Sequence, residues 1–263
     1  MGHDPTYLGE IMRDPKENDA KMPDFLSEYM VMTLNKKGPV TTFIDQYANE
    51  FIDYASLENE PVLELAAAYG FVTIEALKKG AKVIANDMDS QHLQILYNQT
   101  PKNYRAQLTL LPGKMPEEVK LTENSIAGCY VARMLGYLEP LELQESLKRI
   151  YSWLMPNKKF IIVSGTPYCY YKFIKNIVPQ YEQRVAQNHP WPGYFTDLKN
   201  WVDEAYRDRV PSWHNYLDGH VLKRELERVG FVVEKVEPFA RQDLPEWAKG
   251  RGHDAVFVRA RKP

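Results

Sequence analysis

Two apolar segments, each containing or followed by an acidic residue, constrain the fold of this chain more than any other feature. The first, Val62-Leu63-Glu64-Leu65, leads into the small-residue turn Ala66-Ala67-Ala68-Tyr69-Gly70. The second, at 82–86, ends at Asp87, and the spacing from Gly70 leaves room for one crossover helix and a returning strand. Parallel sheets that bind nucleosides place a carboxylate beside a tight turn in this way. The pattern predicts that Asp87 accepts hydrogen bonds from ribose hydroxyls.

Strand and helix patterns alternate from about residue 60 onward. Apolar runs predict strands at 61–65, 82–86, 108–111, 125–131, 159–164, 231–236 and 254–261. Helical patterns occur at 71–79, 90–99, 140–154 and 220–229. Such alternation predicts a parallel sheet with helices on both faces, and the late pair of strands is expected to be antiparallel. The expected fold class is therefore α/β, with a seven-stranded, mostly parallel sheet whose last strand is antiparallel.

The chain is expected to form one domain, 1–263, with two elaborations. Residues 1–59 are expected to be a helical N-terminal segment over the ligand cleft, with a helix at 39–56. A core at 60–167 is followed by a helical inserted lid at 168–220 and a C-terminal helix and strands at 221–263. Phe, Trp and Tyr make up 12 of the 53 residues in the insertion. This enrichment predicts either an apolar substrate wall or a separate core for the insertion.

Composition narrows the classes of function. The 263 residues carry a net charge of −2, which gives no sign of a nucleic-acid partner. The two cysteines, Cys129 and Cys169, are expected to be reduced thiols in a cytoplasmic protein. The sequence has no apolar run long enough for a membrane span and no cluster of His, Cys and carboxylate residues at metal-ligand spacing, so we expect neither a membrane nor a metal.

The small residues of the turn distinguish between nucleotide ligands. Phe71 stands where a dinucleotide fingerprint needs its third glycine, which disfavours a nicotinamide oxidoreductase. The pattern Glu64-x-Ala66-x-Ala68-x-Gly70 resembles instead the first motif, [DE]-x-G-x-G-x-G, of class I S-adenosylmethionine-dependent methyltransferases. Alanine lacks the freedom of glycine at positive φ. The turn is therefore expected either to use negative φ at both alanines or to keep the cofactor slightly further away.

Further segments resemble the same family in order and spacing. Gly113-Lys114-Met115 stands where the family often has Gly-Asp-Ala, and the run 125–131 resembles its fourth strand with Ala127 in place of an acid. The run 132–139 resembles the segment that closes over the methionine end, and 226–231 resembles the L-x-x-A-G-F that leads into strand six. The resemblance covers about 60–165 and 220–261.

The resemblance implies S-adenosylmethionine as the cofactor and a set of residues that bind it. Backbone groups and apolar packing by Met88 and Met115 are expected to hold the adenine where Lys114 replaces the usual acid. Asp89 is expected to cap the helix that follows it rather than to bind ribose. The implied cofactor-binding residues are Glu64, Ala66, Ala68, Tyr69, Gly70, Asp87, Met88, Lys114, Met115, Val131 and Arg133.

The expected activity is methyl transfer to a small organic acceptor. Transfer to a protein side chain is the alternative within the enzyme class. A cofactor-binding protein without transfer activity is the alternative from another class, because Ala66, Ala68, Lys114 and Ala127 all depart from the family pattern. Candidate bases for the acceptor proton are His214, His189, His220 and Tyr168.

Overall fold

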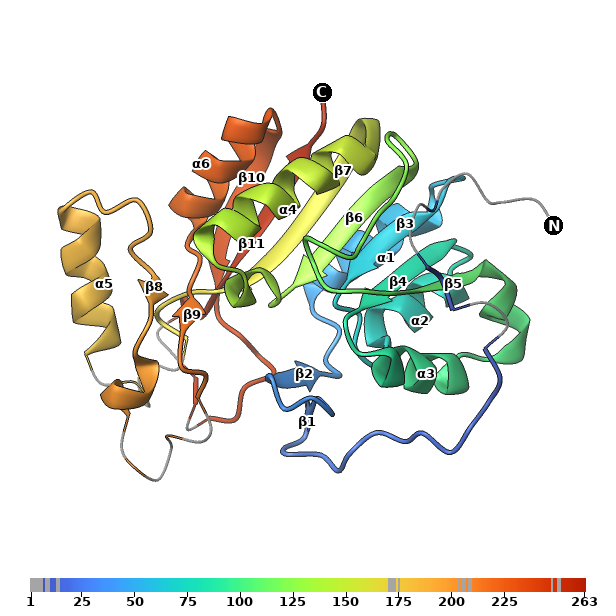
Figure 1. The fold of residues 1–263 in the computed structure, drawn as a ribbon, viewed down its shortest axis with the longest axis horizontal. Helices are drawn as coiled ribbons and strands as arrows, with labels where there is room; N and C mark the ends of the chain where they lie inside the picture. Colours follow the sequence, from blue (N-terminus) through green and yellow to red (C-terminus); the bar gives the residue numbers. More distant parts are fainter. Residues whose placement is uncertain are drawn as a thin grey trace.

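A seven-stranded sheet forms the centre of the protein (Figure 1). The computed structural model describes residues 7, 10–12, 15–169, 174, 176–202, 204, 207, 210–246, 248–249 and 252–263. The strands of the central sheet are β3 (Val62–Leu65), β4 (Val83–Asp87), β5 (Leu108–Pro112), β6 (Ile126–Ala132), β7 (Leu154–Gly165), β10 (Val232–Phe239) and β11 (Ala255–Arg261). Their order is β10-β11-β7-β6-β3-β4-β5, and β11 is antiparallel to both neighbours while the other pairs are parallel. The expected sheet, with its antiparallel last strand, is confirmed.

Five helices cover the two faces of this sheet. One face carries α1 (Gln46–Ser56), α2 (Phe71–Lys78) and α3 (Ser90–Gln99), and the other carries α4 (Pro140–Trp153) and α6 (Gly219–Val229). The four helices expected after residue 60 are present to within one residue at each end. None of the helices in the described part of the chain combines the length and the apolar character needed to cross a lipid bilayer.

Both faces of the central strands are buried, which explains why these strands are largely apolar, whereas the edge strand β10 is mostly exposed and carries charged residues. In β7, Phe160 and Ile162 pack in the core beneath α4 and α6, whereas Ile161 and Val163 pack in the core beneath α1 and α2. Successive side chains of a strand point to opposite faces, so a strand covered on both faces has no polar alternation. The same feature makes the apolar runs visible in the sequence.

The order of the strands places a cleft at the carboxyl ends of the sheet. The chain runs outward from β3 to β4 and β5, then returns to the other side of β3 to form β6. Connections that leave β3 and β6 therefore diverge in opposite directions. Open α/β sheets bind ligands at this switch point, outside the carboxyl ends of the strands.

The expectation of a helical N-terminal segment is wrong for most of its length. Residues 30–41 form a two-stranded hairpin of β1 (Met30–Met32) and β2 (Pro39–Thr41), and helix α1 begins only after Asp45. The side chain of Asp45 caps α1 by accepting hydrogen bonds from the backbone N–H groups of Tyr47 and Ala48 at 3.0 and 2.8 Å. The preceding Pro-Val-Thr-Thr run favours extended backbone, because β-branched residues lose side-chain freedom in a helix.

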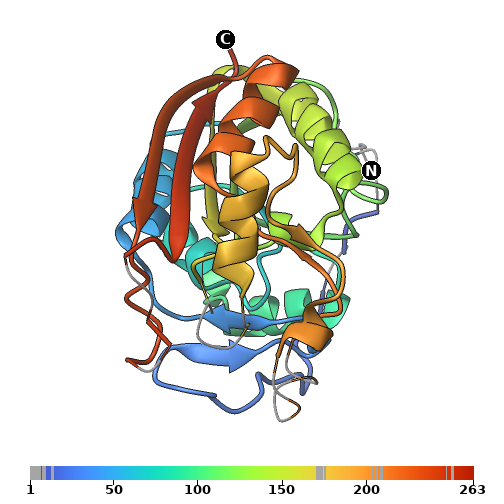
Figure 2. The same cartoon turned by 90° about the vertical axis from the view of Figure 1, so that its left-hand side faces the viewer.

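The hairpin lies across the carboxyl ends of the central strands (Figure 2). The residues before it follow an extended path along α3. The side-chain amide of Asn98 donates to the backbone oxygens of Asn18 and Ala20, and Arg105 forms an ion pair with Glu17 at 2.7 Å. The N-terminal segment thus covers the cleft, as expected, but not as a helix. It is an extended segment, residues 15–45, that includes the β1–β2 hairpin and is called the strap below.

The insertion after β7 has its own small core. Its described elements are α5 (Ile177–Ala186), a 3-10 helix (Leu198–Trp201) and the paired short strands β8 (Tyr194–Phe195) and β9 (His214–Asn215). Its buried cluster consists of Ile174, Ile177, Tyr181, Phe195, Leu198, Val202 and Tyr216. Most of the described aromatic residues here therefore serve the insertion itself. Among them, Tyr216 also lines the cleft.

Candidate active site

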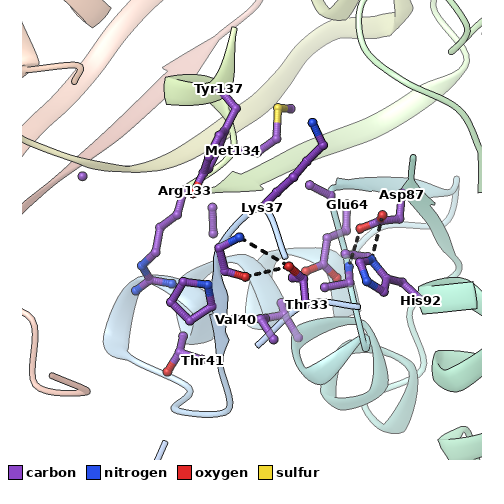
Figure 3. A pocket seen from close by; sticks show the side chains of 18 of the residues that line it. Thr33, Lys37, Val40, Thr41, Glu64, Asp87, His92, Arg133, Met134 and Tyr137 are labelled. Atoms are coloured by element: carbon purple, nitrogen blue, oxygen red, sulfur yellow. Dashed lines mark hydrogen bonds and ion pairs between the residues drawn. The ribbon is translucent and has the colours of Figure 1, made fainter. Parts of the chain in front are cut away.

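A cavity of about 270 Å³ opens at the carboxyl ends of the parallel strands. Its floor comes from residues that end or follow β3, β4, β5, β6 and β7, and its roof comes from residues 33–45 of the strap (Figure 3). Figure 3 shows Asp87 and His92 at one end of this cavity and Arg133 with Tyr137 toward the other. The cavity therefore extends along the whole cleft, from the end of β4 at Asp87 to the segment after β6 at Arg133.

The turn after β3 adopts left-handed backbone at three alternate residues. The φ angles are 53° at Ala66, 47° at Ala68 and 78° at Gly70. Of the two alternatives offered for this turn, negative φ at both alanines is therefore wrong, and a cofactor slightly further away stays a prediction. The left-handed region costs an alanine about 1 kcal/mol, so the turn keeps a glycine-type path at the expense of strain. A Cβ at Gly70 would lie 1.9 Å from Leu96 Cδ1, which explains the glycine there.

The carboxylate of Asp87 holds the strained turn in place. Its Oδ2 accepts a hydrogen bond from the backbone N–H of Ala68 at 2.9 Å. Its Oδ1 accepts one from the backbone N–H of Asp89 at 2.9 Å and lies 3.0 Å from Nδ1 of His92. Asp89 Oδ1 in turn accepts from the backbone N–H of Gln91 at 3.0 Å, which confirms Asp89 as the cap of α3.

Glu64 lies beneath the turn with its side chain buried. Burial raises the pKa of this carboxyl group to about 7, and the opposing hydrogen bond from the hydroxyl of Thr73 reduces the shift only in part. The negative charge of Asp87 adds to the increase. Glu64 therefore changes its protonation state near neutral pH, whereas an exposed glutamate is ionised there.

The loop after β5 borders the cavity beside Asp87. The side-chain amide of Asn86 donates to the backbone oxygens of Leu111 and Gly113 at 2.8 and 3.0 Å and so fixes this loop to the end of β4. Met88 lines the cavity beside it, and its side chain is 45% exposed. Lys114 pairs with Glu142 of α4 at 3.3 Å, so its charge is already balanced.

His214 lines the other end of the cavity between two tyrosines. Its ring centroid lies 4.8 Å from that of Tyr137 and 4.5 Å from that of Tyr216, both in edge-to-face geometry. Burial lowers the pKa of His214 to about 4, so the ring is neutral at pH 7. Its Nδ1 is buried and has no hydrogen-bond partner among the described residues.

Two arginines complete this end of the cavity. Arg133 follows β6 and approaches Asp45 at 3.5 Å, and its buried Nε has no hydrogen-bond partner in the described part of the chain. Arg241 is buried and bonds both carboxylate oxygens of Asp243, at 3.0 and 2.6 Å. Burial alone would raise the pKa of Asp243, but Arg241 outweighs it and holds that pKa at about 2.

Comparison with solved structures identifies the fold. The chain aligns with an S-adenosylmethionine-dependent methyltransferase from Methanosarcina mazei at a TM-score of 0.59 and 13% identity, covering 81% of this chain and 96% of that one. It aligns with another from Mesorhizobium loti at 0.57 and 18%, covering 84% and 100%. This protein has the class I methyltransferase fold.

A third structure with the class I fold is the glycopeptide N-methyltransferase MtfA in complex with S-adenosylmethionine. It aligns at a TM-score of 0.54 and 20% identity, covering 82% of this chain and 86% of that one. Comparison with models of protein families gave no match, and comparison with curated protein sequences gave none either. The relationship is therefore visible in the three-dimensional arrangement and not in overall sequence identity.

Most of the residues that the sequence predicts for the cofactor meet around the cavity of this methyltransferase fold. Those that line it are Glu64, Ala66, Ala68, Asp87, Met88, Lys114, Met115 and Arg133. Three others do not line it, and their contact with the cofactor stays a prediction. Tyr69 is fully buried and donates its hydroxyl hydrogen bond to the backbone oxygen of Met32, Gly70 caps α2, and Val131 points into the core beneath α4.

The four candidate bases separate in the structure. His214 lines the cavity. Tyr168 and His220 instead border a second cavity between the insertion and the outer strands β10 and β11. His189 is exposed, and its Nδ1 accepts a hydrogen bond from the backbone N–H of Trp191 at 3.1 Å. Of the four candidate bases, only His214 lies beside the ligand cleft.

Several lining residues were not predicted from the sequence. They are Thr33, Lys37, Thr41, Asn86, His92, Tyr137, Tyr216 and Arg241. Two of them had a local signal: Asn86 directly precedes the expected ribose acid, and His92 lies one helical turn after the cap Asp89. Tyr137 belongs to the run 132–139, which the sequence already placed over the cleft, and the remaining residues come from segments whose position depends on the tertiary fold.

Proposed function

We propose that this protein transfers a methyl group from S-adenosylmethionine to a small organic acceptor. The observation that carries the proposal is the bond between Asp87 and the left-handed turn at Ala68, at the carboxyl ends of adjacent strands and open to the cavity. A turn with this backbone brings main-chain atoms close to a ligand, and the acid beside it suits a ribose. The shared fold of the methyltransferases supports the same conclusion.

The residues around the turn suit the parts of this cofactor. Asp87 Oδ2 accepts one hydrogen bond from Ala68 and retains acceptor capacity for a ribose hydroxyl. The side chains of Met88 and Met115 offer apolar, polarisable contacts for an adenine ring. Glu64, when ionised, balances the positive charge of the amino-acid end.

The other end of the cavity suits the acceptor. S-adenosylmethionine supplies an activated methyl group, so the acceptor heteroatom forms a bond to the methyl carbon while the carbon–sulfur bond breaks and its electron pair leaves with S-adenosylhomocysteine. The acceptor must then lose its proton. His214 is neutral at pH 7 and has an unpartnered buried Nδ1, so it is the described residue best suited to take that proton. The rings of Tyr137 and Tyr216 hold its imidazole in place.

The strap favours a small acceptor over a protein side chain. Residues 33–45 form a roof over the cavity, and Arg241 and Cys169 line it beside the insertion. A roofed cavity limits the size of the acceptor and helps to exclude water and to fix the reacting groups, which is what methyl transfer needs from a protein.

Calorimetry with S-adenosylhomocysteine tests the cofactor. We expect binding, and we expect Asp87→Asn to weaken it by about 1.5–3 kcal/mol, the usual loss for a hydrogen bond to a charged group. Asp89→Asn is the matched control, because asparagine also caps a helix and Asp89 is not among the lining residues. NADH should give no heat of binding. Binding of NADH with no response to S-adenosylhomocysteine would overturn the proposal.

Transfer itself is tested with labelled S-adenosylmethionine and a fractionated cell extract. We expect label in the small-molecule fraction, and a loss of about 100-fold or more in rate for His214→Phe at unchanged affinity for S-adenosylhomocysteine. His220→Asn, at an exposed histidine outside the cleft, should leave the rate unchanged. Label in protein would instead identify a protein side-chain methyltransferase. Cofactor binding without transfer to any fraction would identify a binding protein.

A further inference from the structure

His92 occupies a position that the methyl-transfer chemistry does not require but that links two parts of the site. The side chain is 1% exposed on α3, in the layer between the sheet and the strap. Its Nδ1 lies 3.0 Å from Asp87 Oδ1, and its Nε2 accepts a hydrogen bond from the backbone N–H of Leu34 at 3.0 Å. Leu34 belongs to the loop that connects β1 and β2.

These two contacts define the state of the imidazole. Because Nε2 accepts from Leu34, the ring hydrogen is on Nδ1, and Nδ1 donates to Asp87. The ring also meets Tyr69 edge to face at 5.2 Å, and Tyr69 donates to the backbone oxygen of Met32 in the same hairpin. The other charged group near His92 is Asp89, whose Oδ2 is 3.6 Å from Nε2.

The hydrogen bond from His92 helps to set which oxygen of Asp87 keeps a free acceptor position. Oδ1 accepts from His92 and from the backbone N–H of Asp89, so both of its acceptor positions are used. Oδ2 accepts only from Ala68 among the described residues, so it keeps one position free. Without His92 the carboxylate loses one of the two contacts that hold Oδ1, and only the backbone N–H of Asp89 remains.

We propose that His92 is a positioning residue that orients Asp87 toward the cofactor and fastens the β1–β2 loop over it. The loop contributes Thr33, Asn35, Lys37 and Gly38 to the cavity wall. One side chain thus connects the ribose acid to the roof, so a ligand that immobilises Asp87 also immobilises the loop at Leu34 through His92. The part of this inference that concerns the cofactor rests on the proposed function.

Two substitutions separate the contacts of His92. Asparagine places an amide nitrogen where Nδ1 lies but does not reach Leu34, whereas glutamine reaches the position of Nε2 and loses the donor to Asp87. We measure the affinity for S-adenosylhomocysteine by calorimetry and the protection of the Leu34 amide by hydrogen exchange. His92→Gln should weaken binding by about tenfold or more with Leu34 still protected. His92→Asn should keep binding within about threefold of the unaltered protein and lose protection at Leu34.

His92→Leu should lose both the affinity for S-adenosylhomocysteine and the protection of the Leu34 amide. Ile95→Val is the control. Ile95 is buried on the same helix in a cluster with Tyr69, against which Leu34 also packs, so its truncation loosens the same region but leaves both hydrogen bonds of His92 in place. It should keep both properties. The unaltered protein gives a test that needs no variant: S-adenosylhomocysteine should slow exchange at Leu34.

The outcomes distinguish the two proposals. If the unaltered protein binds S-adenosylhomocysteine but His92→Leu binds it equally well, or if ligand leaves exchange at Leu34 unchanged, the positioning role is overturned and the proposed function stands. If the unaltered protein binds no S-adenosylhomocysteine, the proposed function is overturned, and the cofactor half of the His92 inference falls with it.

Discussion

The backbone N–H of Ala68 donates a hydrogen bond to Asp87 Oδ2 at 2.9 Å, which joins the turn after β3 to the end of β4. Ala68 is left-handed, at a φ of 47°, and Asp87 is almost fully buried. The charge of the carboxylate strengthens this bond, and a bond to a charged group contributes about 1.5–3 kcal/mol, enough to offset the cost of one left-handed alanine. The two acidic motifs of the sequence therefore form a single structural unit.

Glycine at position 68 should stabilise the protein. Ala68→Gly removes the cost of the left-handed backbone and should raise the free energy of unfolding by about 1 kcal/mol, measured by urea denaturation. Ala67→Gly is the control, because Ala67 is buried and is not among the residues with positive φ. That change should lower the stability by about 1 kcal/mol. Equal effects at the two positions would contradict the left-handed turn.

Glu64 should make the protein less stable as pH rises. Its pKa of about 7 in the folded state exceeds its ordinary value of 4.5, so the folded state binds more protons in this interval. The contribution of Glu64 to the free energy of unfolding is therefore greatest below about pH 4.5. It decreases between pH 4.5 and 7 and stays at its minimum above pH 7. Glu64→Gln should be more stable than the unaltered protein at pH 8 by up to about 3 kcal/mol, with little difference at pH 4.5. Urea denaturation of both proteins at pH 4.5 and pH 8 measures this. A difference in stability that is the same at both pH values would contradict the prediction.

His214 should have the opposite effect, on the acid side. Its pKa of about 4 lies below the ordinary 6.5, so the unfolded state binds more protons in this interval and stability falls as pH decreases from 6.5 to 4. His214→Phe keeps a ring between Tyr137 and Tyr216 and should reduce this loss by about 1–3 kcal/mol, discounted because part of the residue is exposed. Thermal unfolding at pH 4.5 and 7.5 measures it. The control His189→Phe, at an exposed histidine, should leave the melting temperature unchanged at both pH values.

Arg241 should be essential for stability around the cavity. Arg241→Leu leaves the buried carboxylate of Asp243 without its bidentate partner and should cost about 3–5 kcal/mol. Arg149→Leu removes a more exposed pair with Glu145 and should cost about 1 kcal/mol or less. Melting temperatures of the two variants provide the comparison. Similar small losses would show that the buried pair contributes little.

The sequence was sufficient for the sheet and for the turn and the acid that border the cavity at its carboxyl ends. The runs at 82–86 and 159–164 are apolar because both faces of their strands are covered, and this burial is a local property of each run. Asp87 and the turn at 66–70 were recognised because a strand end and the next helix lie close together in the chain. The same local reasoning failed at 39–45, where β-branched residues pair in a hairpin instead of continuing α1.

The tertiary structure decided how the cleft is completed. The hydrogen bond from Leu34 to His92 joins residues 58 positions apart, and Arg241 approaches Met30 across 211 positions. Such contacts leave no periodic signal, because they depend on where the strap and the outer loops come to lie after the sheet has formed. Sequence by itself determined which faces are buried and where the acid follows a strand, since each depends on neighbouring residues. The left-handed alanines, the roof and the setting of His214 depend on contacts made only in the folded chain, and only the tertiary structure supplied them.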